Sequence, residues 1–135
     1  MKKAGLVLAL SILITTLASA QVSVCSLKTN RLSEPVGISP ESAPILSWML
    51  ESPERNTVQE AYEINVSAGG KTVWSSGRVE SDNSIAVPYG GPLSPDTRYT
   101  WSVKVWDNRG KSSKKACSSF ATGLRAGDWQ AQWVG

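Results

Sequence analysis

The sequence predicts an all-β fold, a sandwich of seven antiparallel strands preceded by a signal-peptide helix. Three observations support this prediction. After residue 21, apolar residues recur at every second position in short runs and show no helical period of useful length. Glycine, proline, asparagine, aspartate and serine separate these runs. The length of 135 residues suits one domain and not two.

The first 20 residues have the three parts of a secretory signal peptide. Lys2 and Lys3 form a basic start, residues 4–17 are mostly apolar, and residues 18–20 form a small-residue cleavage pattern before Gln21. The apolar run is shorter than the ~20 residues of a membrane span. We therefore expect cleavage, export to the periplasm or the outside of a bacterial cell, and no membrane attachment of the mature chain.

The charge of the mature chain argues against nucleic-acid partners. The whole chain has 14 basic and 11 acidic residues, a formal charge of +3. Removal of Lys2 and Lys3 leaves 12 basic against 11 acidic residues, a balance of +1. Nucleic-acid binding needs a clustered basic face, and the sequence has no such cluster.

The first half of the mature chain contains four candidate strands, each bounded by turn residues. They are residues 22–28, 45–50, 59–68 and 72–74. Side chains on a strand alternate between its two faces, so each strand turns one set inward. The side chains expected in the core are Leu46, Trp48, Leu50, Tyr62, Ile64 and Val66.

The second half contains three further candidate strands. They are residues 84–89, 99–106 and 113–122. The run from Tyr99 has the clearest alternation, with every second side chain apolar up to Val105 and with Trp106 facing outward. Gly110 closes the turn that follows, where a positive φ is needed. Seven short strands in about 100 residues are typical of an immunoglobulin-like or fibronectin type III-like sandwich.

The two cysteines, Cys25 and Cys117, belong to the first and last predicted strands. An exported chain meets an oxidising compartment, which permits a disulfide. Such a bridge would contribute about 4–5 kcal/mol on the chain-entropy model. Sequence spacing alone does not show whether their Cβ atoms come close enough for a bond. A disulfide bridge and two separate thiols therefore remain as alternatives.

Three aromatic residues are expected to have structural roles. Residues 93–99, which lead into the strand with Trp101, resemble the tyrosine corner of fibronectin type III domains. In that motif a tyrosine hydroxyl bonds to the upstream backbone, and Tyr99 has the matching position. Trp48 and Trp101 are expected to fill the core, because large side chains suit a small sandwich.

A series of short motifs, in a fixed order, resembles one protein family. The motifs are residues 35–38, 44–48, 59–66, 74–79, 81–84, 97–101, 120–123 and 129–135. Together they are similar to the N-terminal immunoglobulin-like domain of bacterial α-L-rhamnosidases, glycoside hydrolase family 78. The resemblance implies a non-catalytic accessory domain, here a fragment, of an exported enzyme that acts on rhamnose-containing glycans. The catalytic carboxylates of that family lie in a helical barrel far downstream, so the resemblance assigns no catalytic residue here.

The domain organisation follows from these segments. Residues 1–20 are the predicted signal peptide, residues 21–123 the sandwich, and residues 124–135 the start of a following, truncated domain. Trp129 and Trp133 alternate with polar residues in the last segment. We expect them to contact the downstream domains of the parent enzyme.

The residues themselves predict no catalytic centre, metal site or cofactor. Histidine is absent, which excludes triads and metal sites that depend on it. Glu60 with Glu63, and Glu80 with Asp82, are interpreted as surface charges. An alternative function is a stand-alone carbohydrate-binding or protein-interaction module. In the carbohydrate case, the exposed rings of Trp106 and Trp74 would stack on sugars.

Overall fold

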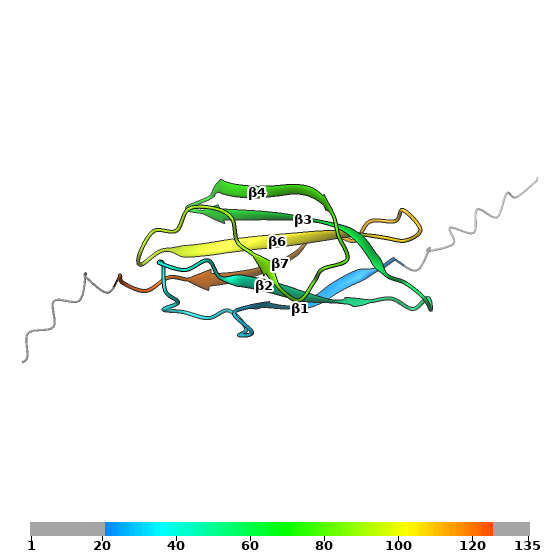
Figure 1. Ribbon diagram of the computed structural model, residues 1–135, viewed down its shortest axis with the longest axis horizontal. Coiled ribbons are helices and arrows are strands. Elements are labelled where there is room, and N and C mark those ends of the chain that lie inside the picture. The colour runs from blue at the N-terminus through cyan, green and yellow to red at the C-terminus, as the bar shows by residue number, and fades with distance from the viewer. Residues whose placement is uncertain (1–20, 126–135) are drawn as a thin grey trace, which may run out of the picture.

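The computed structural model describes residues 21–125, which form seven strands and no helix. The strands are β1 (Ser23–Thr29), β2 (Ile45–Glu51), β3 (Gln59–Ala68), β4 (Lys71–Glu80), β5 (Val87–Pro88), β6 (Arg98–Asp107) and β7 (Ala116–Ala121). They build a small sheet in the order β1-β2-β5 and a large sheet in the order β4-β3-β6-β7 (Figure 1). All pairings are antiparallel. The predicted sandwich is confirmed; the predicted signal-peptide helix lies outside the described residues.

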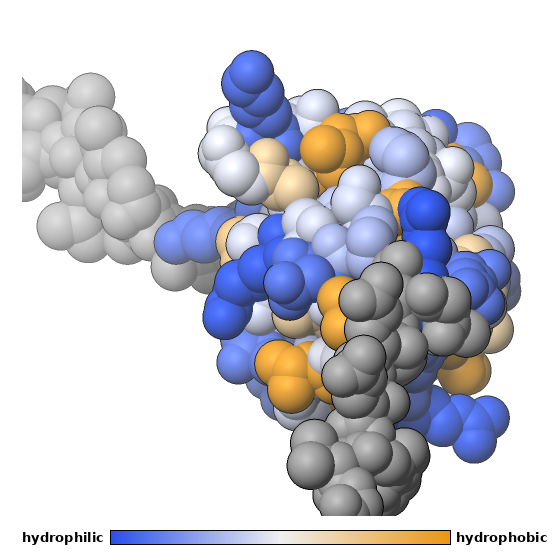
Figure 2. Space-filling view, turned by 90° about the vertical axis from the view of Figure 1, so that its left-hand side faces the viewer, coloured by the Kyte–Doolittle hydropathy of each residue, from blue (hydrophilic) through white to orange (hydrophobic). Residues whose placement is uncertain are grey.

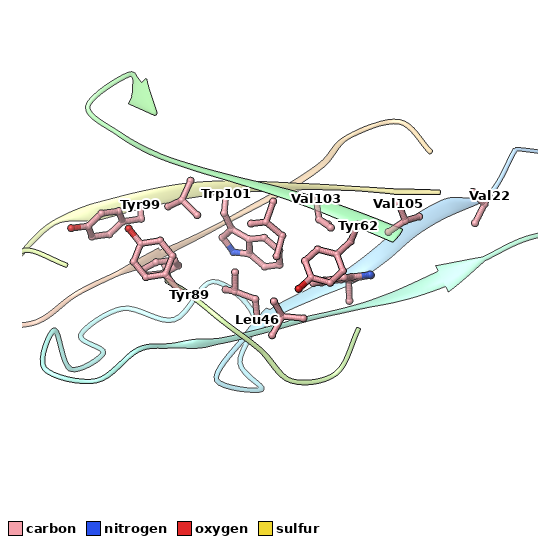
Figure 3. Close-up of a cluster of buried hydrophobic side chains, with 13 residues drawn as sticks. Val22, Leu46, Tyr62, Tyr89, Tyr99, Trp101, Val103 and Val105 are labelled. Atoms are coloured by element: carbon pink, nitrogen blue, oxygen red, sulfur yellow. The ribbon is translucent and has the colours of Figure 1, made fainter. Parts of the chain in front are cut away.

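The core lies between the two sheets and is built from the alternating side chains. Trp101 of β6 points toward Leu46 of β2, and both are fully buried (Figure 3). The inward residues predicted for β3 and β6 are buried, and Leu50 of β2 is only partly buried. Apolar burial, at ~25 cal/mol per Å², is the main term that stabilises such a sandwich.

Strand β4 is longer than predicted. It runs from Lys71 to Glu80, whereas the sequence predicted only residues 72–74. The polar residues after Trp74 were not part of a predicted strand, but they continue the ladder with β3 through two register shifts. At one of these, the Ile64 N–H donates to Ser76 Oγ at 2.8 Å. A side chain thus supplies the hydrogen bond that the bulge removes from the backbone.

Strand β5 is shorter than predicted. It contains only Val87 and Pro88, whereas residues 84–89 were expected to be extended. The side chain of Asn83 holds a turn instead, because its Oδ1 accepts from the N–H groups of Ile85 and Ala86, each at 3.2 Å. The expected alternation therefore fails at Ile85, whose side chain is 79% exposed.

The described chain begins and ends at opposite ends of the sandwich (Figure 1). At the end where β7 finishes, the loop before β2 is tied to it: Ile38 N–H donates to the Ala121 carbonyl, and Gly123 N–H donates to the Ile38 carbonyl. We call this the exit end. No helix among residues 21–125 is long and apolar enough to cross a membrane.

Candidate functional site

The outer face of the large sheet is polar and largely neutralises its own charges. Glu63 of β3 is in register with Arg78 of β4 on one side and Lys104 of β6 on the other. Arg78 Nε also contacts Glu80 Oε1 at 2.7 Å. The other outward positions carry small polar side chains, among them Asn65, Ser67, Thr100 and Ser102. This face offers a partner few unpaired charges and little apolar area.

Trp106 lies on this outer face, as its place in the alternation predicted. It is half-buried and opposite Ala61, which is fully buried. The guanidinium carbon of Arg78 is 4.5 Å from the centroid of the Trp106 ring, and Lys104 Nζ is 5.1 Å from it. These are cation–π distances. The ring therefore already has two cationic partners.

Trp74 lies on the edge strand β4, and its partly buried side chain packs against the core. Its ring meets Tyr89 edge-to-face, with centroids 5.2 Å apart. It also lies against the Gly90–Gly91 turn: a Cβ added at Gly90 would be 3.2 Å from the indole, and one at Gly91 would be 2.6 Å from Trp74 Cβ. The two glycines are thus required for the close packing of this indole.

Stacking on a sugar needs an aromatic ring with one open face. Trp106 is covered by two cations and Trp74 by Tyr89 and the glycine turn. The two indoles also lie apart in register, because Trp106 pairs toward Ala61 and Trp74 toward Val66. Sugar binding by either tryptophan stays a prediction that this geometry does not favour.

The three residues with predicted structural roles all lie in the core. The Ser94 N–H donates to the Tyr99 hydroxyl at 2.7 Å, which is the hydrogen bond of a tyrosine corner. Trp48 is 3% exposed, and its Nε1–H donates to Gln59 Oε1 at 2.8 Å. Trp101 is fully buried, and nothing within residues 21–125 accepts from its indole N–H.

Cys25 and Cys117 are free thiols in this structure. Cys25 is in register with Met49 on the outer side of the small sheet, whereas Cys117 is in register with Ser102 on the outer side of the large sheet. Cross-strand partners share a face of their sheet, so the two thiols face away from each other. In this arrangement the two thiols are not placed to form a bridge.

No cluster of metal-ligating side chains is present within residues 21–125. No group of three or more His, Cys, Asp or Glu side chains in this part of the chain could hold a metal ion. Glu80 is engaged by Arg78, and Glu63 accepts from Asn65 Nδ2 at 3.2 Å. These carboxylates belong to the surface network of the large sheet.

The outer face of the small sheet is more mixed: Ile45 and Met49 of β2 alternate there with Ser47 and Glu51, and Lys28 of β1 lies opposite Ser47. We call it the small-sheet face and define it by the residues Cys25, Ile45, Ser47, Met49 and Ile85. Two adjoining hollows, of about 360 and 210 Å³, both have Ser47 and Ile85 in their walls. This face was not predicted from the sequence. The alternation of β2 that buries Leu46 also turns Ile45 and Met49 outward, and this signal could have found it.

Apolar side chains are also exposed at the exit end. Leu32, Val36 and Leu124 are exposed there, by 57%, 78% and 44%. Figure 2, which looks at this end, shows separate hydrophobic side chains among hydrophilic ones, close to where the described chain ends. Ile45 adjoins this end, because the Asn30 N–H in the neighbouring turn donates to its carbonyl at 2.8 Å.

A family model described as "Rha78A-like, N-terminal immunoglobulin domain" matches residues 24–126. The chain is 43% identical over 119 residues to an α-L-rhamnosidase of Streptomyces avermitilis, with 82% of this chain and 12% of that protein covered. It is 35% identical over 116 residues to an α-L-rhamnosidase of Formosa agariphila, with 78% of this chain and 12% of that protein covered.

Comparison with solved structures also finds similarity to α-L-rhamnosidases. The chain is similar to part of the crystal structure of the Streptomyces avermitilis α-L-rhamnosidase complexed with L-rhamnose, with a TM-score of 0.78 and 42% identity. That match covers 84% of this chain and 12% of the other. The chain therefore spans about 12% of the length of the curated relatives that it matches.

Proposed function

The chain belongs to the family of Rha78A-like N-terminal immunoglobulin domains, and from this membership we propose that it works as a non-catalytic accessory domain of an α-L-rhamnosidase. The observation that carries the proposal is its similarity to a 12% segment of two proteins with that name. The rest of such an enzyme would bind and cleave rhamnose-containing glycans, while this domain helps to hold the neighbouring domains in place.

The use of the polar and aromatic groups supports an accessory role. The hydroxyls of Tyr89 and Tyr99 bond to the backbone of one loop. Gln59 bonds to a tryptophan and to a second loop. These groups stabilise the sandwich itself, and Glu63 and Glu80 lie beside the cations of the large sheet. A rigid framework of this kind suits positioning rather than chemistry.

The domain boundaries and the cellular location are part of the proposal. Residues 1–20 would be removed as a signal peptide, residues 21–123 form the sandwich, and residues 124–135 lead into the following domain. Cleavage would place the mature protein in the periplasm or outside the cell. The mass of the mature N-terminus, measured on protein from a secreting bacterial host, tests this: a start at Gln21 supports it, and a start at Met1 contradicts it.

Contact with other parts of the enzyme is proposed at Trp129 and Trp133, which lie outside the described residues. Both have large aromatic side chains, and they lie in a segment where apolar and polar residues alternate. Large aromatic side chains supply most of the contact energy in protein interfaces. Glycan contact through Trp106 or Trp74 is the weaker part of the proposal. Retention on a rhamnose-containing polysaccharide gel that is unchanged by both Trp106→Ala and Trp74→Ala would contradict it.

A side-by-side activity assay tests the proposed function. The 135-residue chain and the product of the longest reading frame that contains it are purified, and each is given a p-nitrophenyl α-L-rhamnoside. We expect p-nitrophenol release by the longer protein and none by the 135-residue chain. Release by the short chain, or an inactive longer protein that is folded, contradicts the proposal.

A further inference from the structure

We propose that the small-sheet face, together with the exit end, is the surface on which the next domain of the parent enzyme docks. The inference rests on the proposed function, because it needs a longer protein. It goes beyond it by assigning one face of the sandwich to that contact. The expected partner surface is apolar at its centre and carries carboxylates at its edge.

The distribution of exposed apolar side chains selects this surface. Among residues 21–125, seven large apolar side chains are exposed. Ile45, Met49 and Ile85 lie on the small-sheet face, and three more lie at the exit end. Only Val58 lies elsewhere, in the loop before β3. Exposed apolar residues are ordinary when scattered singly, but their concentration on one sheet face and on the end next to it is typical of an interaction site.

The shape of the small-sheet face suits a protein partner. Met49 and Ile85 are exposed by 60% and 79%, and they stand beside the two adjoining hollows. Side chains of a partner could fill these hollows, and the exposed side chain of Ile85 could insert into the surface of the partner. A buried apolar centre of this kind is where interfaces concentrate their binding energy.

The charges beside the hollows define the rim of the partner. Arg31 lies in the wall of the larger hollow and Lys28 in the wall of the smaller one. No Asp or Glu lines either hollow. Within residues 21–125, neither cation takes part in an ion pair. Two unpaired cations at the edge of an apolar surface are complementary to carboxylates.

The other broad face does not compete for this role. On the large sheet, Arg78 and Lys104 already contact Trp106, and Glu63 lies in register between these two cations. Docking there would cost the desolvation of a neutralised polar network with little apolar burial in return. The two faces of the sandwich thus differ in chemistry: the large-sheet face pairs its own charges, whereas the small-sheet face exposes Met49 and Ile85 beside two cations that form no ion pair within residues 21–125.

The identity of the occupant follows from the direction of the chain. The described chain leaves the sandwich at the exit end, where the Gly123 N–H donates to the Ile38 carbonyl. The relatives extend far beyond the matched segment, which is 12% of their length. A domain that follows directly is held close at high effective concentration, so even a modest apolar face suffices to dock it.

The two native cysteines make a matched pair of probes. Cys25 lies on the small-sheet face opposite Met49, and Cys117 lies on the large-sheet face. Alkylation by iodoacetamide is followed by peptide mass spectrometry in the 135-residue chain and in the longer protein. We expect Cys25 to react at least about tenfold more slowly in the longer protein, because a docked state that outnumbers the open state by about ten to one would expose the thiol only a tenth of the time. Cys117 should react at the same rate in both.

Charge substitutions give a second, independent arm. Met49→Lys combined with Ile85→Lys places cations on the apolar centre, and Val58→Lys is the control on an equally exposed apolar residue elsewhere. Because these side chains are exposed, the melting temperature of the 135-residue chain should stay unchanged. In the longer protein, the double variant should restore fast labelling of Cys25, and Val58→Lys should not.

The outcomes separate this inference from the proposed function. Equal labelling of Cys25 in both proteins, with the longer protein active as a rhamnosidase, overturns the docking inference alone. Protection of Cys25 that appears in the 135-residue chain as it dimerises makes a second copy the occupant and also overturns it. An inactive longer protein, or a reading frame that ends with this chain, overturns the proposed function itself.

Discussion

At the scale of single residues, two buried tyrosines hold the loop between β5 and β6. The Tyr89 hydroxyl donates to the Pro92 carbonyl at 2.8 Å, and the Tyr99 hydroxyl accepts from the Ser94 N–H at 2.7 Å. Their rings are 6.3 Å apart, and Tyr99 stacks on Phe120 at 5.2 Å. One aromatic cluster therefore fills the core at this end and satisfies the backbone of the loop that crosses it.

Tyr99→Phe should reduce the stability of the domain. The change keeps the ring but leaves the partly buried Ser94 N–H without its acceptor, which costs about 1–3 kcal/mol. The measurement is urea unfolding followed by tryptophan fluorescence. Tyr62→Phe is the matched control, because no hydrogen bond within residues 21–125 uses the Tyr62 hydroxyl. Equal losses in both variants would show that the Tyr99 hydroxyl has no special role.

Tyr89 should make the domain less stable in strong base. Burial, and to a smaller extent the neighbouring Tyr99, raises the pKa of Tyr89 from 10.0 to about 12. Above pH ~10 the unfolded chain loses this proton while the folded chain keeps it, so the unfolded state is favoured. Stability from this group is therefore complete below pH ~10 and falls until about pH 12.

Denaturant titrations at several pH values between 9 and about 12 would measure this slope. Tyr89→Phe removes the titrating group and should flatten the curve, although it also loses the bond to Pro92 and so lowers stability at every pH. A wild-type curve no steeper than that of the variant would contradict the assignment.

At the scale of elements, Gln59 joins three segments at the start of β3. Its Oε1 accepts from the Trp48 indole in β2, and its Nε2 donates to the carbonyls of Ser81 and Asn83, each at 3.0 Å. The residue is 5% exposed. It thus links the two sheets and holds the loop that carries Ile85 out of the sandwich.

Gln59→Leu should therefore destabilise the domain by more than the similar size of the two side chains suggests. The indole N–H of Trp48 and two loop carbonyls lose their partner, at a cost of at least about 2 kcal/mol. Glu60→Gln, one position along on the exposed side of β3, should stay within about 0.5 kcal/mol. Thermal unfolding followed by circular dichroism measures both. A near-neutral Gln59→Leu would mean that these bonds contribute little.

The strands that could be predicted are those whose side chains alternate strictly. The runs around Ile64 in β3 and Val103 in β6 are buried on one side only, so the pattern in the sequence carries the register. β4 and β5 could not be predicted in length. Edge strands bury less, so the polar run of β4 showed no alternation, and the turn at Asn83 depends on one side chain whose bonds are not visible in a pattern.

At the scale of the whole molecule, the sequence could predict the fold and the family but only part of the surface. Alternation placed Trp106 outward, and it does lie there. Whether Arg78 covers the Trp106 ring depends on the register of β4, and the sequence pattern did not predict that register. The small-sheet face needs Ile85 beside Met49, two residues from distant segments that only the folded structure brings together.

The central claim is that this sandwich supports a rhamnosidase without taking part in its chemistry. The most direct measurement compares the longer protein with a version that lacks residues 21–123, both assayed for release of p-nitrophenol from the rhamnoside before and after graded heating. We predict a kcat that agrees within about twofold at low temperature and a lower inactivation temperature for the shortened protein. A folded shortened protein that has lost its kcat, or one that resists heat equally well, would contradict the account.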